Sequence, residues 1–160
     1  MAEILLIGCA LVAATVGIHA VGSTLWLAHV TGRYLRDGGS WSSLRMLVAL
    51  LGTVIFLSSL HVIQIVLWAV TYLEFVPDVL PTFEKAFYFS IVTFTTLGYG
   101  DITLHEGIRV LSGIESLSGI LVVGWTTAVM YSVVQRAWSG LDIAAKFRDH
   151  QKNQTRSDIQ

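Results

Sequence analysis

Seven residues in the middle of the chain, Thr95 to Asp101, read TTLGYGD and combine two glycines, two hydroxyls, one aromatic ring and one carboxylate. The glycines stand at alternate positions, where they allow backbone angles that are closed to other residues. Successive carbonyl oxygens of such a run can point to the same side, instead of alternating as they do in a strand. A column of carbonyl oxygens can replace the water around a monovalent cation, so the run indicates ion coordination.

The rest of the chain has the composition of a membrane protein. Hydrophobic residues make up 54% and charged residues 13%, against roughly 25% charged residues in soluble domains. None of the 10 Lys and Arg lies in three long stretches, each long enough to cross about 30 Å of hydrocarbon as a helix. The first stretch lacks the basic start of a cleavable signal peptide, so we expect it to be retained. The predicted spans are approximately Ile4–Val30, Leu47–Leu73 and Ile108–Arg136.

Charge predicts the orientation of these spans. Arg33, Arg36 and Arg45 lie between the first two, which places that connection in the cytoplasm and the N-terminus outside. The basic residues from Arg136 to Arg156 then lie on the same cytoplasmic side. We therefore expect a multi-pass protein of the cell membrane, of the bacterial inner or plasma membrane type. Its surroundings are membrane lipids, and we predict no nucleic-acid partner.

The segment from Phe75 to Gly107 neither spans the membrane nor resembles a soluble loop. Pro77 and Pro81 end the second span. A short helix is predicted from Thr82 to Phe94, with Thr82 as its N-cap. At about 20 Å it is too short to cross, so we expect a re-entrant helix. Non-helical backbone at membrane depth is tolerated only where it is buried in protein or lines a water-filled path.

The run Thr95–Asp101 resembles the selectivity filter of potassium channels, with Leu97 in place of the commoner valine. The resemblance covers roughly the C-terminal two thirds of the chain, and the first span shares no motif with it. Val92 stands where some relatives carry a carboxylate behind the filter. Further similarity, to the pore helix and to small bacterial channels, involves Glu84–Ser90, Arg109, Glu115, Gly119, Gly124, Trp125–Ala128, His61, Gln64, Trp68 and Ala69.

The resemblance implies an ion-binding filter for K+, not an enzyme. The ion would be bound by the backbone carbonyls of Thr96, Leu97, Gly98 and Tyr99, together with the Thr96 hydroxyl. Asp101 would form the outer mouth. One loop cannot encircle an ion, so a homotetramer around a central pore is implied. The transported K+ is the only cofactor implied, with no organic cofactor. The filter residues are Thr96, Leu97, Gly98, Tyr99 and Gly100.

Three features of the third span carry alternative interpretations. Gly119 is either a hinge for opening the pore or a site of close packing against the short helix. Glu115, an acid within a span, is either a structural brace to hydroxyls or backbone at the foot of the short helix, such as Thr93, which we favour, or a group in direct contact with the ion. A stripe with helical spacing is either cavity lining or a helix seam, and it comprises Ile120, Val123, Thr127, Tyr131 and Val134.

Other classes of function were weighed against the channel. A general monovalent cation pore, or a silent accessory subunit, would keep the architecture. A haem-binding subunit would use His19 and His61 as axial ligands, whereas a simpler interpretation gives both histidines hydrogen bonds between helices. No span carries arginine at every third position, as a voltage sensor would.

The sequence thus predicts an all-α membrane protein with three transmembrane helices, a re-entrant pore helix and a filter loop. Residues 1–45 would form an additional helix with a basic connection, and residues 46–136 the pore domain. Residues 137–160 would be a short cytoplasmic tail, either lying on the membrane surface or prolonging the third helix, with its last ten or so residues disordered. With a tail this short, we expect no gating by a large cytoplasmic regulatory domain.

Overall fold

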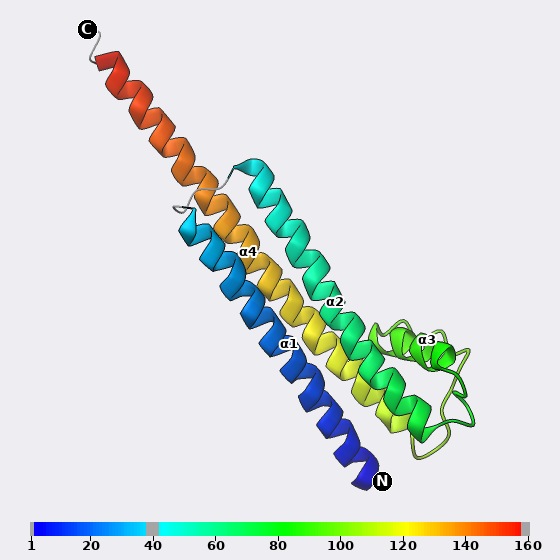
Figure 1. The fold of residues 1–160 in the computed structure, drawn as a ribbon. Helices are drawn as coiled ribbons and strands as arrows, with labels where there is room; N and C mark the ends of the chain where they lie inside the picture. The colour runs from blue at the N-terminus through cyan, green and yellow to red at the C-terminus, as the bar shows by residue number, and fades with distance from the viewer. Residues whose placement is uncertain (1, 38–41, 158–160) are drawn as a thin grey trace.

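Four helices make up the part of the chain that the structure describes. The computed structural model describes the backbone of residues 2–37 and 42–157, and side chains through Arg136. Within these residues there is no strand, which confirms the all-α prediction. The helices are α1 (Ala2–Arg36), α2 (Ser43–Phe75), α3 (Phe83–Phe94) and α4 (Arg109–Ser157), in the order shown in Figure 1.

Three of the helices are long and apolar enough to cross a membrane, namely α1, α2 and the part of α4 from Arg109 to Arg136. Taken over their full lengths, α1, α2 and α4 are each longer than the predicted span. The backbone of α4 continues to Ser157 without a break, so the prediction that the last ten or so residues are disordered is wrong as far as that residue. Adding residues to an existing helix costs little compared with starting one, so a span can extend into water beyond the bilayer.

The ends of α2 and α3 follow local sequence signals. The Ser42 side chain caps the start of α2, and α2 ends just before Pro77. The Thr82 hydroxyl accepts a hydrogen bond from the backbone N–H of Lys85 at 3.3 Å, as expected for an N-cap. With 12 residues, α3 is too short to cross, as predicted.

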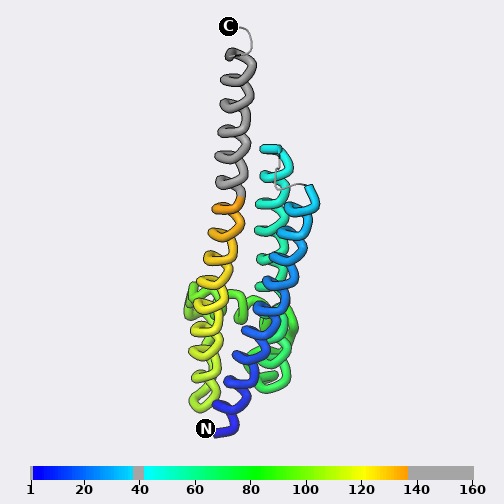
Figure 2. Tube along the Cα trace, turned by 90° about the vertical axis from the view of Figure 1, so that its left-hand side faces the viewer, coloured from blue at the N-terminus to red at the C-terminus, as the bar shows by residue number. Residues whose placement is uncertain are grey.

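The three long helices lie side by side, and α3 packs beside one end of them (Figure 1). The start of α1 lies at the same end as α3, and the C-terminal end of α4 lies at the opposite end (Figure 1), while Figure 2 shows the start of α1 and α3 at the same end from a second side. α1 contacts both α2 and α4. The additional first helix is therefore an integral part of the packed bundle.

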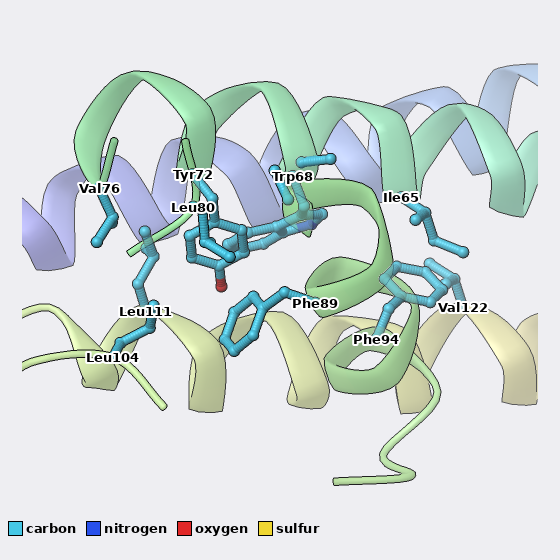
Figure 3. Packing of buried hydrophobic residues seen from close by; sticks show 12 residues of the cluster. Ile65, Trp68, Tyr72, Val76, Leu80, Phe89, Phe94, Leu104, Leu111 and Val122 are labelled. Carbon is cyan, nitrogen blue, oxygen red and sulfur yellow. The ribbon is translucent and has the colours of Figure 1, made fainter. Parts of the chain in front are cut away.

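The hydrophobic core lies where α3 is wedged between α2 and α4 (Figure 3). Trp68 and Tyr72 of α2 are fully buried there, and Tyr72 meets Phe89 of α3 edge-on, with ring centroids 5.0 Å apart. Phe94, at the end of α3, and Val122 of α4 are also buried. This core fixes α3, and hence the start of the glycine-containing loop, relative to the long helices.

Candidate functional site

The backbone after α3 takes an unusual conformation. Positive φ angles occur at every second residue, at Thr96 (58°), Gly98 (57°) and Gly100 (75°). Glycine adopts such angles without steric cost, whereas threonine does so at about 1–2 kcal/mol. Alternating glycines were the feature of the sequence that predicted this conformation, and Thr96 extends the alternation by one more step.

Three consecutive backbone amides of this loop turn back toward α3. The N–H of Thr96 donates to the Thr93 carbonyl at 2.9 Å, and those of Leu97 and Gly98 donate to the Val92 carbonyl at 2.9 and 3.2 Å. In a planar trans peptide the carbonyl points opposite to the N–H. The carbonyls of Thr95, Thr96 and Leu97 therefore all point away from α3, which a strand would not allow.

The far end of the loop is held by side chains. The Tyr88 hydroxyl of α3 donates to Asp101 Oδ2 at 2.8 Å. Nearby, His105 Nε2 donates to Asp78 Oδ2 at 2.7 Å, joining the segment that follows the loop to the turn between α2 and α3. This hydrogen bond holds the pKa of the exposed Asp78 carboxyl below its usual value. Both ends of the loop are thus tied to the bundle.

Glu115 braces α3 from behind. Its carboxylate is fully buried and accepts a hydrogen bond from the Tyr72 hydroxyl at 2.8 Å and one from the Ser90 hydroxyl at 2.5 Å. A hydroxyl from each of α2 and α3 therefore meets a carboxylate from α4. The predicted brace is present, but Thr93 is not its partner: the Thr93 carbonyl accepts from the Ser116 hydroxyl at 2.9 Å.

Gly119 lies directly against the end of α3. A Cβ built on it would overlap the Phe94 carbonyl oxygen and lie 3.0 Å from the Phe94 carbonyl carbon. The absence of a side chain at Gly119 is what allows α4 to approach the base of the loop so closely. The structure therefore agrees with the interpretation of Gly119 as a site of close packing against the short helix. The role of Gly119 as a hinge stays a prediction.

Within the part of the chain that the structure describes, the predicted stripe on α4 is mostly uncovered. Ile120 is 58% exposed, Val123 47% and Tyr131 63%, and Thr127 is exposed as well. Only Val134 is half-buried. Leu97 and Tyr99 of the loop are also more than half exposed. In the single chain, the stripe and the side chains of Leu97 and Tyr99 are therefore accessible to lipid, to water or to another protein chain.

His19 and His61 do not form a haem site. Their imidazoles are stacked, with centroids 5.2 Å apart and planes 21° from parallel. All four ring nitrogens lie within hydrogen-bond distance of Gln64 or Thr126. Two axial ligands must instead point at an iron between them, so the haem interpretation is wrong and the interpretation as hydrogen bonding between helices is correct.

Several functional contacts went unpredicted because they join residues far apart in the chain. Tyr72 and Ser90 were not identified as partners of Glu115, and Thr15 and Thr126 were not connected to the histidines. One signal was available. His61 and Gln64 stand three residues apart on one helix face, which is the spacing of a side-chain hydrogen bond.

Comparison with known proteins identifies the matching region. Residues 44–136 match the model of a family described as ion channel. A segment of 55 residues is 44% identical to the potassium voltage-gated channel protein Shal of Drosophila melanogaster, covering 33% of this chain and 10% of that protein. No solved structure matches the chain. The matched family region contains α2, α3, the loop and the membrane part of α4.

Proposed function

Because the chain belongs to the ion channel family, we propose that it is a potassium-selective channel, which conducts K+ passively through a filter formed by residues 96–100. The observation that carries the proposal is the loop backbone, in which successive carbonyls point away from α3. Carbonyl oxygens held in this way can replace the hydration shell of K+. The similarity to Shal, a potassium channel by its name, supports the same ion.

Four copies of the chain would form the pore. One loop supplies carbonyls on one side of an ion only, so closure needs rotational symmetry. The exposed side chains of Leu97 and Tyr99, and the exposed stripe on α4, are the surfaces that such an assembly would cover or turn toward the axis. Ile120, Val123, Thr127 and Tyr131 would then line the cavity below the filter.

The filter would open to the outside of the cell. The start of α1 lies at the α3 end of the bundle (Figure 1). The end of α1 and the start of α2, which carry the basic residues Arg33, Arg36 and Arg45, lie toward the other end. The positive-inside rule therefore places the N-terminus and Asp101 outside and the C-terminus in the cytoplasm. Asp101, held by Tyr88, would form the outer mouth.

Opening would occur at the inner half of α4, with Gly119 as the proposed hinge. Voltage gating is not carried over from Shal, because none of the four described helices has arginine at every third position. Ions would move down their gradient, binding the carbonyl sites tightly enough to enter and weakly enough to leave.

The test is recording from the purified chain in lipid bilayers with K+ and Na+ gradients opposed. We expect a reversal potential close to the K+ equilibrium value. Gly98→Ala should move it toward zero, because a methyl group disfavours the φ of +57° at that position. Gly107→Ala is the matched control, since its φ of +95° is also unfavourable for alanine but lies outside the filter.

Two results would contradict this function. A wild-type reversal potential midway between the two equilibrium values would indicate a non-selective cation pore. Equal selectivity in the wild type and in Gly98→Ala, with Gly107→Ala also unchanged, would show that the loop does not select the ion.

A further inference from the structure

A pocket lies between the three long helices, toward the end of the bundle opposite α3. All three helices contribute to its apolar wall, which includes Leu27 and Val30 of α1, Ala49 and Leu50 of α2, and Val133 of α4. Water finds no hydrogen-bond partner on such a wall, and apolar cavities in proteins stay dry. The wall therefore suits a hydrocarbon chain and not a polar ligand.

Polar side chains line the same pocket on the side nearer to water. Along α1, Tyr34 comes seven residues after Leu27, which places it about 10 Å farther along the helix. Along α4, Arg136 comes after Val133. Both helices run toward the end of the bundle opposite α3 (Figure 1). The pocket thus has an apolar part that lies deeper in the bundle and a polar rim at its end.

This rim lies at the level where the membrane meets water. Each long helix has a stretch without any Lys, Arg, Asp or Glu, and at this end of the bundle the three stretches stop at Arg33 of α1, Arg45 of α2 and Arg136 of α4. Arginines at the ends of such stretches place their charged heads among the phosphates of the lipid headgroups. The apolar wall then lies at the depth of the acyl chains, and the rim at the depth of the phosphates.

The Arg136 guanidinium is positioned to bind a phosphate. It donates a hydrogen bond to the Thr31 hydroxyl, which joins α4 to α1 at the pocket. Arginine has five N–H donors, so this contact leaves others for a ligand. Among the side chains that the structure describes, no carboxylate forms an ion pair with Arg136. A guanidinium can meet two phosphate oxygens with two parallel hydrogen bonds.

The charges around the rim also favour an anion. Arg33 and Arg36 lie in the last turn of α1, and Arg45 lies near the start of α2. The acid at this end of the described bundle is Asp37, which is bonded to Arg45 at 3.3 Å. A group of basic side chains at the membrane surface attracts anionic lipids over about a Debye length.

We propose that this pocket binds one anionic phospholipid, with an acyl chain along the apolar wall and the phosphate at Arg136. A free anion would leave the wall uncovered, and a lipid without net charge would gain less from the basic rim. α1 supplies part of the wall and the Thr31 contact, although it lies outside residues 44–136 that match the ion channel family. The additional helix thereby gains a function that does not depend on which ion the protein conducts.

The test is native mass spectrometry of the purified full chain in a mild detergent, titrated with dioleoyl phosphatidylglycerol or with dioleoyl phosphatidylcholine. The two lipids have the same acyl chains, and only the first has a net negative charge. We expect one tightly bound phosphatidylglycerol per chain, with an affinity about 5-fold or more above that for phosphatidylcholine.

Arg136→Gln tests the phosphate contact. The variant should bind both lipids with similar affinity, because the favourable charge at the pocket is lost. The matched control is Arg109→Gln, which makes the same change at the opposite end of the membrane part of α4. We expect Arg109→Gln to keep the wild-type preference.

Ala49→Leu tests the wall without a change in charge. The larger side chain would occupy the pocket, so the affinity for both lipids should fall. Its control is Ala28→Leu, at an exposed position of α1 that does not line the pocket, and we expect it to bind as the wild type does. Thermal unfolding checks that each variant is folded, and Val30→Phe fills the pocket from α1 if Ala49→Leu does not fold.

Several results would overturn the lipid site. One is equal wild-type affinity for the two lipids, and another is a preference that persists in Arg136→Gln. Phosphatidylglycerol binding that is unchanged in the folded pocket-filling variants would place the lipid on the basic surface and not in the pocket. Displacement of the lipid by an equal concentration of inorganic phosphate would indicate a site for a free anion.

The lipid site and the proposed channel can fail separately. The expected lipid preference in a chain that passes no K+ would overturn the channel function alone. K+-selective conduction by a chain that does not distinguish the two lipids would overturn the lipid site alone.

Discussion

Gly119→Ala is the substitution for which the structure makes its sharpest quantitative prediction. The new methyl group would overlap the Phe94 carbonyl, which is backbone at the end of α3 and cannot rotate away as a flexible side chain could. Overpacking of this kind costs about 1–3 kcal/mol. Because the neighbour is backbone, we expect a value toward the upper end of that range.

The matched control is Gly113→Ala, on the same helix, where a Cβ would meet nothing within 4 Å. Both substitutions gain the same helix propensity, about 1 kcal/mol. Their difference in unfolding free energy therefore isolates the packing cost at Gly119. With about 2–4 °C per kcal/mol for a chain of this size, we expect Gly119→Ala to melt about 6–12 °C below Gly113→Ala.

The assay is thermal unfolding of the detergent-purified variants, followed by intrinsic fluorescence, with recordings of open probability and reversal potential on the same preparations. Since Phe94 lies two residues before Thr96, a displaced Phe94 should also disturb ion selectivity. Equal melting temperatures for the two variants would refute the packing argument. If Gly119→Ala then opened less often while its selectivity was unchanged, the hinge alone would explain Gly119.

Three further predictions concern the supports of the loop. Tyr72→Phe removes a buried hydrogen bond to Glu115 and should lower the unfolding free energy by about 1–3 kcal/mol in thermal or denaturant unfolding. Thr82→Ala removes the N-cap of α3 and should cost about 1 kcal/mol in the same assay. Asp78→Asn removes the carboxylate whose pKa is lowered by His105. A lowered pKa in the folded state contributes stability above about pH 4 that is lost as pH falls further, so the melting temperatures of the wild type and Asp78→Asn should converge in acid.

Each of these predictions can fail in a defined way. Tyr131→Phe is the control for Tyr72→Phe, because its hydroxyl lies on an exposed side chain bonded to Gln135. If Tyr131→Phe loses as much stability as Tyr72→Phe, the hydrogen bond from Tyr72 to Glu115 does not act as a specific brace. An unchanged melting temperature in Thr82→Ala would mean that tertiary packing alone holds the start of α3. A gap between the wild type and Asp78→Asn that persists in acid would exclude the hydrogen bond from His105 to Asp78 as its cause.

The sequence by itself was sufficient for features that depend on local chemistry. The three long helices followed from apolar stretches free of lysine and arginine, and the short helix followed from Thr82 and the prolines before it. The backbone of the loop followed from Gly98 and Gly100, because a positive φ angle is easily adopted by glycine and strains any other residue. These signals lie within a few residues of the structure they determine.

Only the tertiary structure decided which helix faces meet. In soluble helices an apolar stripe marks the buried face, but a membrane helix is apolar toward lipid as well, so hydropathy does not show its rotation. The fully buried residues of α1 are small or polar, and one of them, His19, has its partner Thr126 107 residues away. The same holds for Glu115, whose hydroxyl partners come from α2 and α3. Such pairings depend on how helices cross and rotate, which is set by the packing of the whole bundle.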